Sequence, residues 1–392
     1  MALDSRVVGV FGLAAAMFLG SVAVQAGQAA PAAAQAAPPP QGQQPAETVF
    51  KNVTALKGVP VDEFMGTMGF ISNAMGLTCT SCHIGNDGGG WDAYASDANP
   101  RKATARRMIQ MVAAINKDHF AGRQAVTCVS CHNGNTRPRI TTDLAGYYQD
   151  VPQTDEPTDI IRQSVGAPSA DQVLDKYIQA IGGAQKLAGL TSVLAKATYE
   201  PYGVSDKLAA EVYAKAPGQF TTIVHWPFGD VTGTYDGRNA WSAMPDALSP
   251  LGVRTLAKGE LEGAKMDGEL FFPARLKQSL INWKGAVPTA IGDTDVFAIQ
   301  GTSASGLPVK LYFDAESGLL LRLVRYAQTP IGRNPTQVDF DDYRDVAGVK
   351  VPFKRTVAWQ SGRGVYELTD VKANVQIDAA KFAKPAAPAS PR

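Results

Sequence analysis

The chain has 392 residues, enough for about two or three domains of ordinary size. Hydrophobic residues make up 45% of it and charged residues 19%, so folded cores are expected and disorder along the whole chain is excluded. Its 37 basic and 36 acidic residues leave a formal charge of +1, which argues against a nucleic-acid binder. Only four cysteines are present, which also argues against a fold built on many disulfides.

The N-terminus has the pattern of an export signal. Arg6 precedes an apolar run over residues 7–24, and small residues up to Ala26 suit cleavage by a signal peptidase. An uncleaved membrane anchor is the alternative, although a span needs roughly 20 apolar residues. We therefore expect residues 1–26 to be a signal peptide, followed by an Ala-, Pro- and Gln-rich linker over residues 27–46. The expected location is periplasmic, with association of the N-terminus with the inner membrane as a variant.

All four cysteines lie in two C-x-x-C-H motifs. The first motif is Cys79-Thr80-Ser81-Cys82-His83 and the second motif is Cys128-Val129-Ser130-Cys131-His132. This pattern is the attachment signature of c-type haem, in which two thiols bind the porphyrin vinyl groups and the adjacent His ligates iron. The sequence therefore predicts two covalently bound haem c groups. The expected residues are Cys79, Cys82, Cys128 and Cys131 for attachment, and His83 and His132 as iron ligands.

Three other uses of paired cysteines fit the sequence less well. A structural disulfide leaves a His after both pairs unexplained. A zinc site usually separates its two pairs by about 15 to 20 residues, whereas 45 residues lie between Cys82 and Cys128. A thioredoxin-type redox pair requires a different surrounding fold and would not occur twice.

A helix is predicted before each motif. The first is expected over residues 60–75, with Pro60 in its first turn and Gly76 at its C-terminal cap. The second is expected over residues 100–116, with Asn99 as N-cap. Apolar residues recur at helical spacing in both segments.

Both predicted helices carry methionines. A Met thioether on such a helix is suited to ligate haem iron on the side opposite the His, although methionines also fill ordinary cores. Periodicity alone does not distinguish Met68 from Met65, or Met108 from Met111, because each pair lies on one broad helix face. The choice within each pair therefore stays open at this point.

These helices and motifs resemble the cytochrome c subunit of bacterial photosynthetic reaction centres. The matching stretches are V-P-V-D-E-F-M-G-T-M over residues 59–68 with residues 76–83, and A-R-R-M-I-Q-M-V over residues 105–112 with residues 126–132. In that family, each haem unit is a helix carrying the axial Met, a turn and then C-x-x-C-H. The Met four residues after the Phe, and the first Met after the Arg pair, occupy the ligand positions. The resemblance therefore implies Met68 and Met108 as iron ligands.

The resemblance covers about residues 50–140 and differs from well-known family members in two ways. Those members carry four haems and are often lipid-anchored, whereas this chain has two motifs and no cysteine directly at the end of its apolar N-terminal run. The resemblance implies electron donation to a membrane reaction centre. A two-haem carrier that shares the same module and serves respiration is an equally good interpretation.

Basic side chains on the second helix are candidates to pair with haem propionates. Arg106 and Arg107, with Lys102, lie on its polar side, and the Arg fork matches a carboxylate well. A solvated helix face explains the same residues equally well. His119, expected just past the helix end, belongs to no motif and is interpreted as a surface residue rather than a ligand.

The C-terminal part has a different pattern. Residues 141–168 are expected to be a polar linker and residues 384–392 a disordered tail. Between them, residues 169–383 are expected to form an α+β domain, with a helix capped at Ser169 followed by a long antiparallel sheet. The expected strands are residues 208–216, 219–226, 296–301, 309–313, 319–326, 337–343, 349–359 and 367–375.

The order of one helix and a long sheet resembles, in pattern only, the half-barrel of periplasmic lipoprotein carriers of the LolA kind. Such a sheet offers an apolar concave face to an acyl chain or a partner, and a scaffold domain without a ligand is the alternative. The expected fold class is therefore multidomain. A mainly α di-haem c-type cytochrome domain over residues 47–140 precedes an α+β domain with a half-barrel-like antiparallel sheet.

The sequence favours an electron-transfer protein rather than an enzyme, because both axial positions of each iron are expected to be filled. The expected partners are redox proteins, namely a membrane reaction centre or respiratory complex and a soluble donor cytochrome, and no nucleic acid. Two alternatives stay open. One is a di-haem peroxidase or oxidase with one open iron site, and the other is a carrier whose sheet binds a lipid or a partner.

Overall fold

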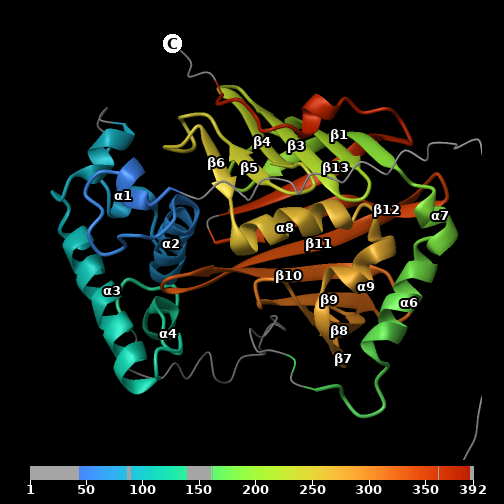
Figure 1. Ribbon diagram of the computed structural model, residues 1–392, viewed down its shortest axis with the longest axis horizontal. Helices are drawn as coiled ribbons and strands as arrows, with labels where there is room; N and C mark the ends of the chain where they lie inside the picture. The colour runs from blue at the N-terminus through green and yellow to red at the C-terminus, as the bar shows by residue number, and fades with distance from the viewer. Residues whose placement is uncertain (1–43, 86–89, 139–159, 161, 361, 389–392) are drawn as a thin grey trace, which may run out of the picture. The chain divides into compact units, whose positions relative to one another are not determined.

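The computed structural model describes residues 44–85, 90–138, 160, 162–360 and 362–388. In this part of the chain, a helical segment comes first and a large antiparallel sheet with its own helices follows (Figure 1). The expected signal peptide lies outside the described residues, as do most of the two expected linkers and the last four residues. None of the described helices is long and apolar enough to cross a bilayer.

The helical segment contains the two long helices that the sequence predicts. Its elements are α1 (Ala46–Val49), α2 (Val61–Met75), η1 (Cys79–Ser81), η2 (Trp91–Ala95), α3 (Pro100–His119) and α4 (Cys128–His132). Gly76 ends α2 with a φ of +62°, a conformation that favours glycine. Pro60 is the N-cap of α2 rather than its first helical residue, because its ψ of 146° is extended. Helix α3 continues through His119, so the prediction that His119 follows the helix is wrong. Basic residues in a last turn stabilise the helix end.

The remainder of the described chain forms a 13-stranded antiparallel sheet, which confirms the expected fold class. The strands are β1 (Ser192–Pro201), β2 (Leu208–Lys215), β3 (Gln219–Trp226), β4 (Gly229–Tyr235), β5 (Ala240–Ala243), β6 (Val253–Leu256), β7 (Ile281–Ile291), β8 (Thr294–Thr302), β9 (Pro308–Asp314), β10 (Leu320–Thr329), β11 (Gly332–Val346), β12 (Val349–Trp359) and β13 (Gly362–Ala373). Strands β1 to β6 follow one another to one edge, and β7 to β13 return from the other edge until β13 pairs with β1.

Five strands, β1 and β4 to β7, were not predicted. Strands β5 and β6 have only four residues each, and β4 and β7 contain glycine or Pro288. A four-residue strand is too short to show a clear alternating pattern, and glycine and proline weaken the pattern in longer strands. The strands predicted at 309–313 and 319–326 pair as the β9–β10 hairpin, and those predicted at 337–343 and 349–359 pair as the β11–β12 hairpin.

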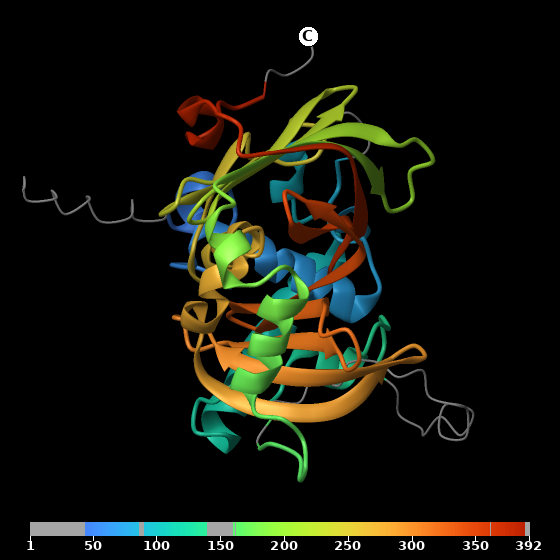
Figure 2. The same ribbon diagram turned by 90° about the vertical axis from the view of Figure 1, so that its right-hand side faces the viewer.

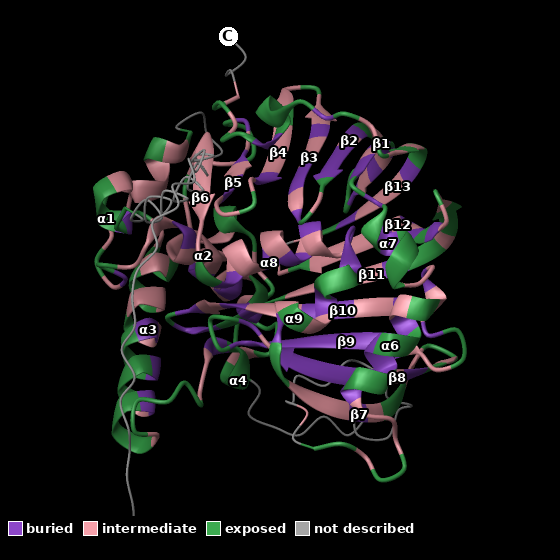
Figure 3. Cartoon of the chain, turned by 45° about the vertical axis from the view of Figure 1, so that its right-hand side comes forward, coloured by how far each residue is buried: buried purple, intermediate pink, exposed green. Residues whose placement is uncertain are grey.

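Helices cover the concave face of the sheet (Figure 2). They are α6 (Ala170–Ala180), α7 (Ala184–Ala188), α8 (Lys258–Glu269), the short turn η3 (Pro273–Arg275) and α9 (Leu276–Ser279), and a last turn, η4 (Ala379–Phe382), follows β13. Helix α6 begins as predicted, since Ser169 Oγ accepts the Gln172 N–H at 3.2 Å. Buried residues of α6, α8 and α9 pack with inward-facing strand residues in the main core (Figure 3).

Helix α8 was not predicted, because three glycines lower its helix propensity. The structure explains them by close approach to the sheet. A Cβ at Gly259 would lie 2.7 Å from the Ala327 Cα, and a Cβ at Gly263 would overlap the guanidinium of Arg325. Helices therefore cover much of the concave face.

The helical segment packs against one end of the sheet. Ile331, in the turn between β10 and β11, is 3% exposed and joins a core formed otherwise by helical-segment residues. That core consists of Leu56, Phe70, Ala74, Ile109, Cys128 and Ile331. Asn334 Nδ2 on β11 donates to the Gly66 carbonyl of α2 at 2.9 Å. The sheet thus supplies part of the packing around Cys128 of the second motif.

Candidate functional site

The two motifs begin with the same cap. The Thr78 N–H donates to Ser81 Oγ at 3.3 Å in the first motif, and the Thr127 N–H donates to Ser130 Oγ at 3.1 Å in the second. Each motif therefore starts as a capped helical turn. The turns then differ: the first is a 3-10 turn over Cys79–Ser81 that ends before His83, and the second is an α-helix over Cys128–His132 that includes its histidine.

His83 is held in the tautomer that suits metal binding. Its Nδ1 lies 3.0 Å from the Tyr94 carbonyl, and its ring stacks on the Tyr94 ring at a centroid distance of 4.7 Å. A carbonyl only accepts hydrogen bonds, so Nδ1 carries the proton and Nε2 has the free lone pair. Burial lowers the pKa of His83, and the charges of Lys102 and Arg106 lower it further, against the hydrogen bond to Tyr94. The neutral imidazole, which is the ligand form, is thereby favoured.

His132 is oriented in the same way. Its Nδ1 lies 3.0 Å from the Asn135 carbonyl, which again assigns the proton to Nδ1 and leaves Nε2 free. The Asn135 N–H in turn donates to the His132 carbonyl at 2.9 Å, so the acceptor belongs to a tight turn directly after the motif. A backbone carbonyl on Nδ1 is the usual partner of a metal-ligating His.

The cysteines and their surroundings fit covalent haem. None of the four cysteines, all of which lie in the described residues, forms a disulfide. Burial raises the pKa of the Cys82 and Cys128 thiols. Ile84 and Val129, in or next to the motifs, are 40% and 38% exposed and offer the apolar contact that a porphyrin requires. In the part of the chain that the structure describes, no cluster of three His, Cys, Asp or Glu side chains is arranged for a metal ion.

The four candidate methionines lie on the two long helices before the motifs. Met68 is half-buried and packs against the core that contains Cys128, whereas Met65 on the same helix is half-buried outside that core. On α3, Met108 is half-buried and Met111 is 43% exposed. These positions are compatible with the predicted ligands Met68 and Met108, which stay predictions.

The basic residues of α3 are tied to the loop beside the first motif. Lys102 Nζ donates to the Tyr94 carbonyl at 2.9 Å, and Arg106 Nη1 pairs with Asp97 Oδ2 at 3.0 Å. The hydrogen bond from Arg106 holds the pKa of Asp97 far below its usual range. Arg107 is exposed and donates to its own helix, at Thr104 Oγ1. The predicted pairing of Arg106 and Arg107 with haem propionates stays a prediction.

Three residues important to these sites were missed in the sequence. Tyr94 and Asn135 act through their backbone carbonyls, so their residue types gave no signal. Asn116 is 9% exposed at the end of α3, and its side chain accepts the Val126 N–H at 2.9 Å and donates to the Val126 carbonyl at 2.7 Å. It fixes the loop that leads into the second motif. The Thr before each first Cys and the Ser before each second Cys were visible as a shared T-C-x-S-C-H pattern.

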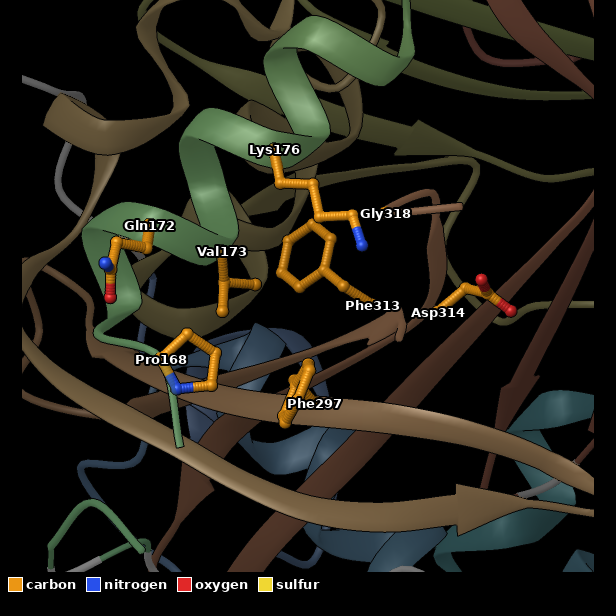
Figure 4. Close-up of a pocket in the computed structure, with 8 residues that line it drawn as sticks. All are labelled: Pro168, Gln172, Val173, Lys176, Phe297, Phe313, Asp314 and Gly318. Atoms are coloured by element: carbon orange, nitrogen blue, oxygen red, sulfur yellow. The ribbon is translucent and has the colours of Figure 1, made fainter. Parts of the chain in front are cut away.

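A separate recess of about 280 Å³ lies between α6 and strands β8 and β9 (Figure 4). Phe297 and Phe313 face Val173 across it, and Lys176 and Asp314 lie at its rim. The Lys176 ammonium already donates to the Ala315 carbonyl at 2.7 Å, and Asp314 accepts the Glu316 N–H at 3.1 Å. These contacts occupy the charged groups, and the recess has no chemistry comparable to that of the two motifs.

Two C-x-x-C-H turns, each with a histidine whose Nε2 is free, have the chemistry of c-type haem attachment sites. The family model described as "Photosynthetic reaction centre cytochrome C subunit" matches residues 2–156. The reaction centre cytochrome c subunit of Thermochromatium tepidum is 37% identical over 98 residues, which are 24% of this chain and 23% of that protein. The corresponding subunit of Rubrivivax gelatinosus is 34% identical over 99 residues, 24% of this chain and 25% of that protein. The chain thus spans about a quarter of the length of these curated relatives.

Among solved structures, a DUF1329 family protein from Desulfovibrio piger matches with a TM-score of 0.39 and 11% identity, over 55% of this chain and 98% of that one. A LolA superfamily protein from Nitrosomonas europaea matches with a TM-score of 0.37 and 14% identity, over 56% of this chain and 99% of that one.

Proposed function

We propose that the chain is a periplasmic di-haem c-type cytochrome that transfers single electrons to or from a membrane redox complex. The observation that carries this proposal is the matched orientation of His83 and His132, each with Nδ1–H on a backbone carbonyl and Nε2 free, directly after a pair of unlinked cysteines. The match of residues 2–156 to a cytochrome subunit family supports it independently.

The residues of each site have separate roles in this proposal. Cys79 and Cys82 would hold one haem c and Cys128 and Cys131 the other, and the His after each pair would supply a nitrogen ligand to iron. Haem c supplies a one-electron Fe(III)/Fe(II) couple. The proposed opposite ligands are Met68 and Met108, whose thioethers favour the reduced state compared with a second His. With these ligands in place, the protein would exchange electrons without binding a substrate at iron.

The proposed partners follow from the same family resemblance. A membrane complex, either a photosynthetic reaction centre or a respiratory enzyme, is the proposed acceptor, and a soluble cytochrome is the proposed donor. A periplasmic location fits covalent haem, and the expected signal peptide would direct export. A lipid in the sheet domain finds little support, because helices cover the concave face.

The mass of the full chain tests the proposal. We would produce it in a host with haem c maturation machinery, denature it in acid and weigh it. The expected mass is that of the polypeptide plus two haems. Variants with both cysteines of one motif changed to Ala should each lose one haem. A mass equal to the bare polypeptide, under conditions in which a known c-type cytochrome matures, would overturn the proposal.

Ligand binding separates an electron carrier from a peroxidase or oxidase. If both axial positions are filled, cyanide added to the ferric protein should bind slowly to both haems, because a Met or His must first leave the iron. Rapid binding by one haem, together with peroxide turnover, would instead identify an enzyme with an open iron site.

A further inference from the structure

The acceptor of the His83 hydrogen bond is shared with a buried cation. The Tyr94 carbonyl lies 3.0 Å from His83 Nδ1 and 2.9 Å from Lys102 Nζ. The Lys102 side chain is only 10% exposed, and its ammonium also donates to the Ser96 carbonyl at 2.7 Å. A positive charge is therefore fixed one atom away from the proton-bearing nitrogen of the first motif, where water screens it weakly.

The second motif lacks this arrangement. The Asn135 carbonyl accepts from His132 Nδ1, and among the described residues no charged side chain forms a hydrogen bond or ion pair with either group. The first motif also contacts the N-terminal end of one helix, whereas the second contacts the C-terminal end of another. Arg101, in the first turn of α3, donates to the Ser81 carbonyl at 2.9 Å, whereas the Gly134 N–H after the second motif donates to the Ala74 carbonyl in the last turn of α2. Helix N-termini carry partial positive charge and C-termini partial negative charge.

From this asymmetry we infer that Lys102 sets the order of the two redox centres, making the haem at the first motif the one of higher reduction potential. Two effects act in the same direction. An ammonium on the Tyr94 carbonyl withdraws electron density from it, weakens it as acceptor of the His83 proton and so makes the imidazole a weaker donor to iron. The fixed charge also disfavours the more positive ferric state through space.

The neighbouring carboxylate opposes this effect. Asp97 Oδ1 lies 3.3 Å from Lys102 Nζ, and Asp97 is half-exposed, so it offsets the ammonium only partly. Arg106, paired with the same carboxylate, leaves the group of three side chains with one net positive charge. Lys102 acts here as a positioning and charge-supplying residue, since it contacts the partner of the ligand rather than the iron. Because the haem at the first motif has the higher potential, a single electron taken up by the protein resides mainly at the first motif.

The inference rests on the proposed function and is tested by potentiometry of the matured di-haem protein. Lys102→Met removes the charge and keeps the chain length. We expect the higher of the two midpoint potentials to fall by about 59 mV, a tenfold change in the one-electron equilibrium, while the lower midpoint stays unchanged. Lys102→Arg should keep the higher midpoint close to that of the parent. Lys51→Met is the matched control, because this 76% exposed Lys pairs with Asp92 outside the hydrogen-bond network.

Asp97→Asn separates a charge effect from a loosened loop. Removing the anion leaves Lys102 unopposed, so the same midpoint should rise, whereas loop disorder would move it in the same direction in both variants. Asp97→Asn also carries the test if Lys102→Met does not fold. The inference is overturned if the lower midpoint moves instead, if neither midpoint moves, or if both variants shift it the same way. Two haems in the mass spectrum of each variant would show that the proposed function survives such a result.

Discussion

Asp62 on α2 and Arg254 on β6 form an ion pair that joins the helical segment to the edge of the sheet, with Arg254 Nη1 3.2 Å from Asp62 Oδ1. The carboxylate is 3% exposed and also accepts the Ala257 N–H at 3.1 Å. Burial raises the pKa of Asp62 to about 6, although Arg254 lowers it. Desolvation therefore outweighs the ion pair at this contact.

The first prediction is a pH dependence of stability that originates at Asp62. Its pKa is raised from 3.8 to about 6 on folding, so the folded state binds the proton more tightly than the unfolded chain. The resulting stabilisation is fully present below about pH 4 and is lost as the pH rises through about 6. We would measure the free energy of unfolding of the parent and of Asp62→Asn in denaturant. The difference, parent minus variant, should fall by about 1–3 kcal/mol between pH 4 and pH 7. Asp92→Asn, at an exposed position, is the control, and equal pH profiles for parent and Asp62→Asn would contradict the prediction.

The second prediction concerns the β10–β11 turn that enters the helical core. A Cβ at Gly332 would overlap the ring of Phe70, which is itself 6% exposed. Gly332→Ala should therefore lower the free energy of unfolding by about 1–3 kcal/mol, since overpacking forces the ring or the hairpin to shift. Gly233→Ala in β4 is the control, because its added methyl would meet only Thr222 Oγ1 at 3.4 Å. Equal stability of the two variants would show that the hairpin does not pack against α2 in solution.

The third prediction concerns Asn116, which holds the loop before the second motif. Asn116→Ala removes its hydrogen bonds to Ala125 and Val126. Because that loop is partly accessible to water, we expect a loss of about 1–2 kcal/mol, the lower part of the range for unsatisfied backbone groups. The protein should also gain less haem at the second motif than at the first, as measured by peptide mass spectrometry. Gln110→Ala, exposed on the same helix, should leave both quantities unchanged. Loss of haem from both motifs alike would argue against a local role.

The fourth prediction tests the axial ligands. Met68→Ala and Met108→Ala should each remove one sulfur–iron absorption band from the ferric spectrum, convert one haem to high spin and lower its reduction potential. Met65→Ala and Met111→Ala are the matched controls on the same two helices and should keep both bands. If a control variant loses a band while its partner keeps it, the ligand assignment within that pair is wrong.

The two motifs and the helices before them could be predicted from the sequence because their determinants are local. The C-x-x-C-H pattern spans about one turn. Asn99 lies directly before α3, which it caps, and Gly76 lies directly after α2. Hairpins such as β9–β10 are similarly specified by a short turn between two apolar runs. Residue type and spacing within a few positions are sufficient for such features.

Contacts between groups far apart in the sequence could be read only from the folded chain. The pairing of β1 with β13, the packing of Ile331 beside Cys128 and the contact of α8 glycines with β10 depend on chain segments far apart in sequence. The Tyr94 carbonyl shared by His83 and Lys102 was also invisible, because a backbone oxygen has no signature in the residue type. Local sequence thus determined the two C-x-x-C-H turns, and the fold determined the charges and packing around each of them.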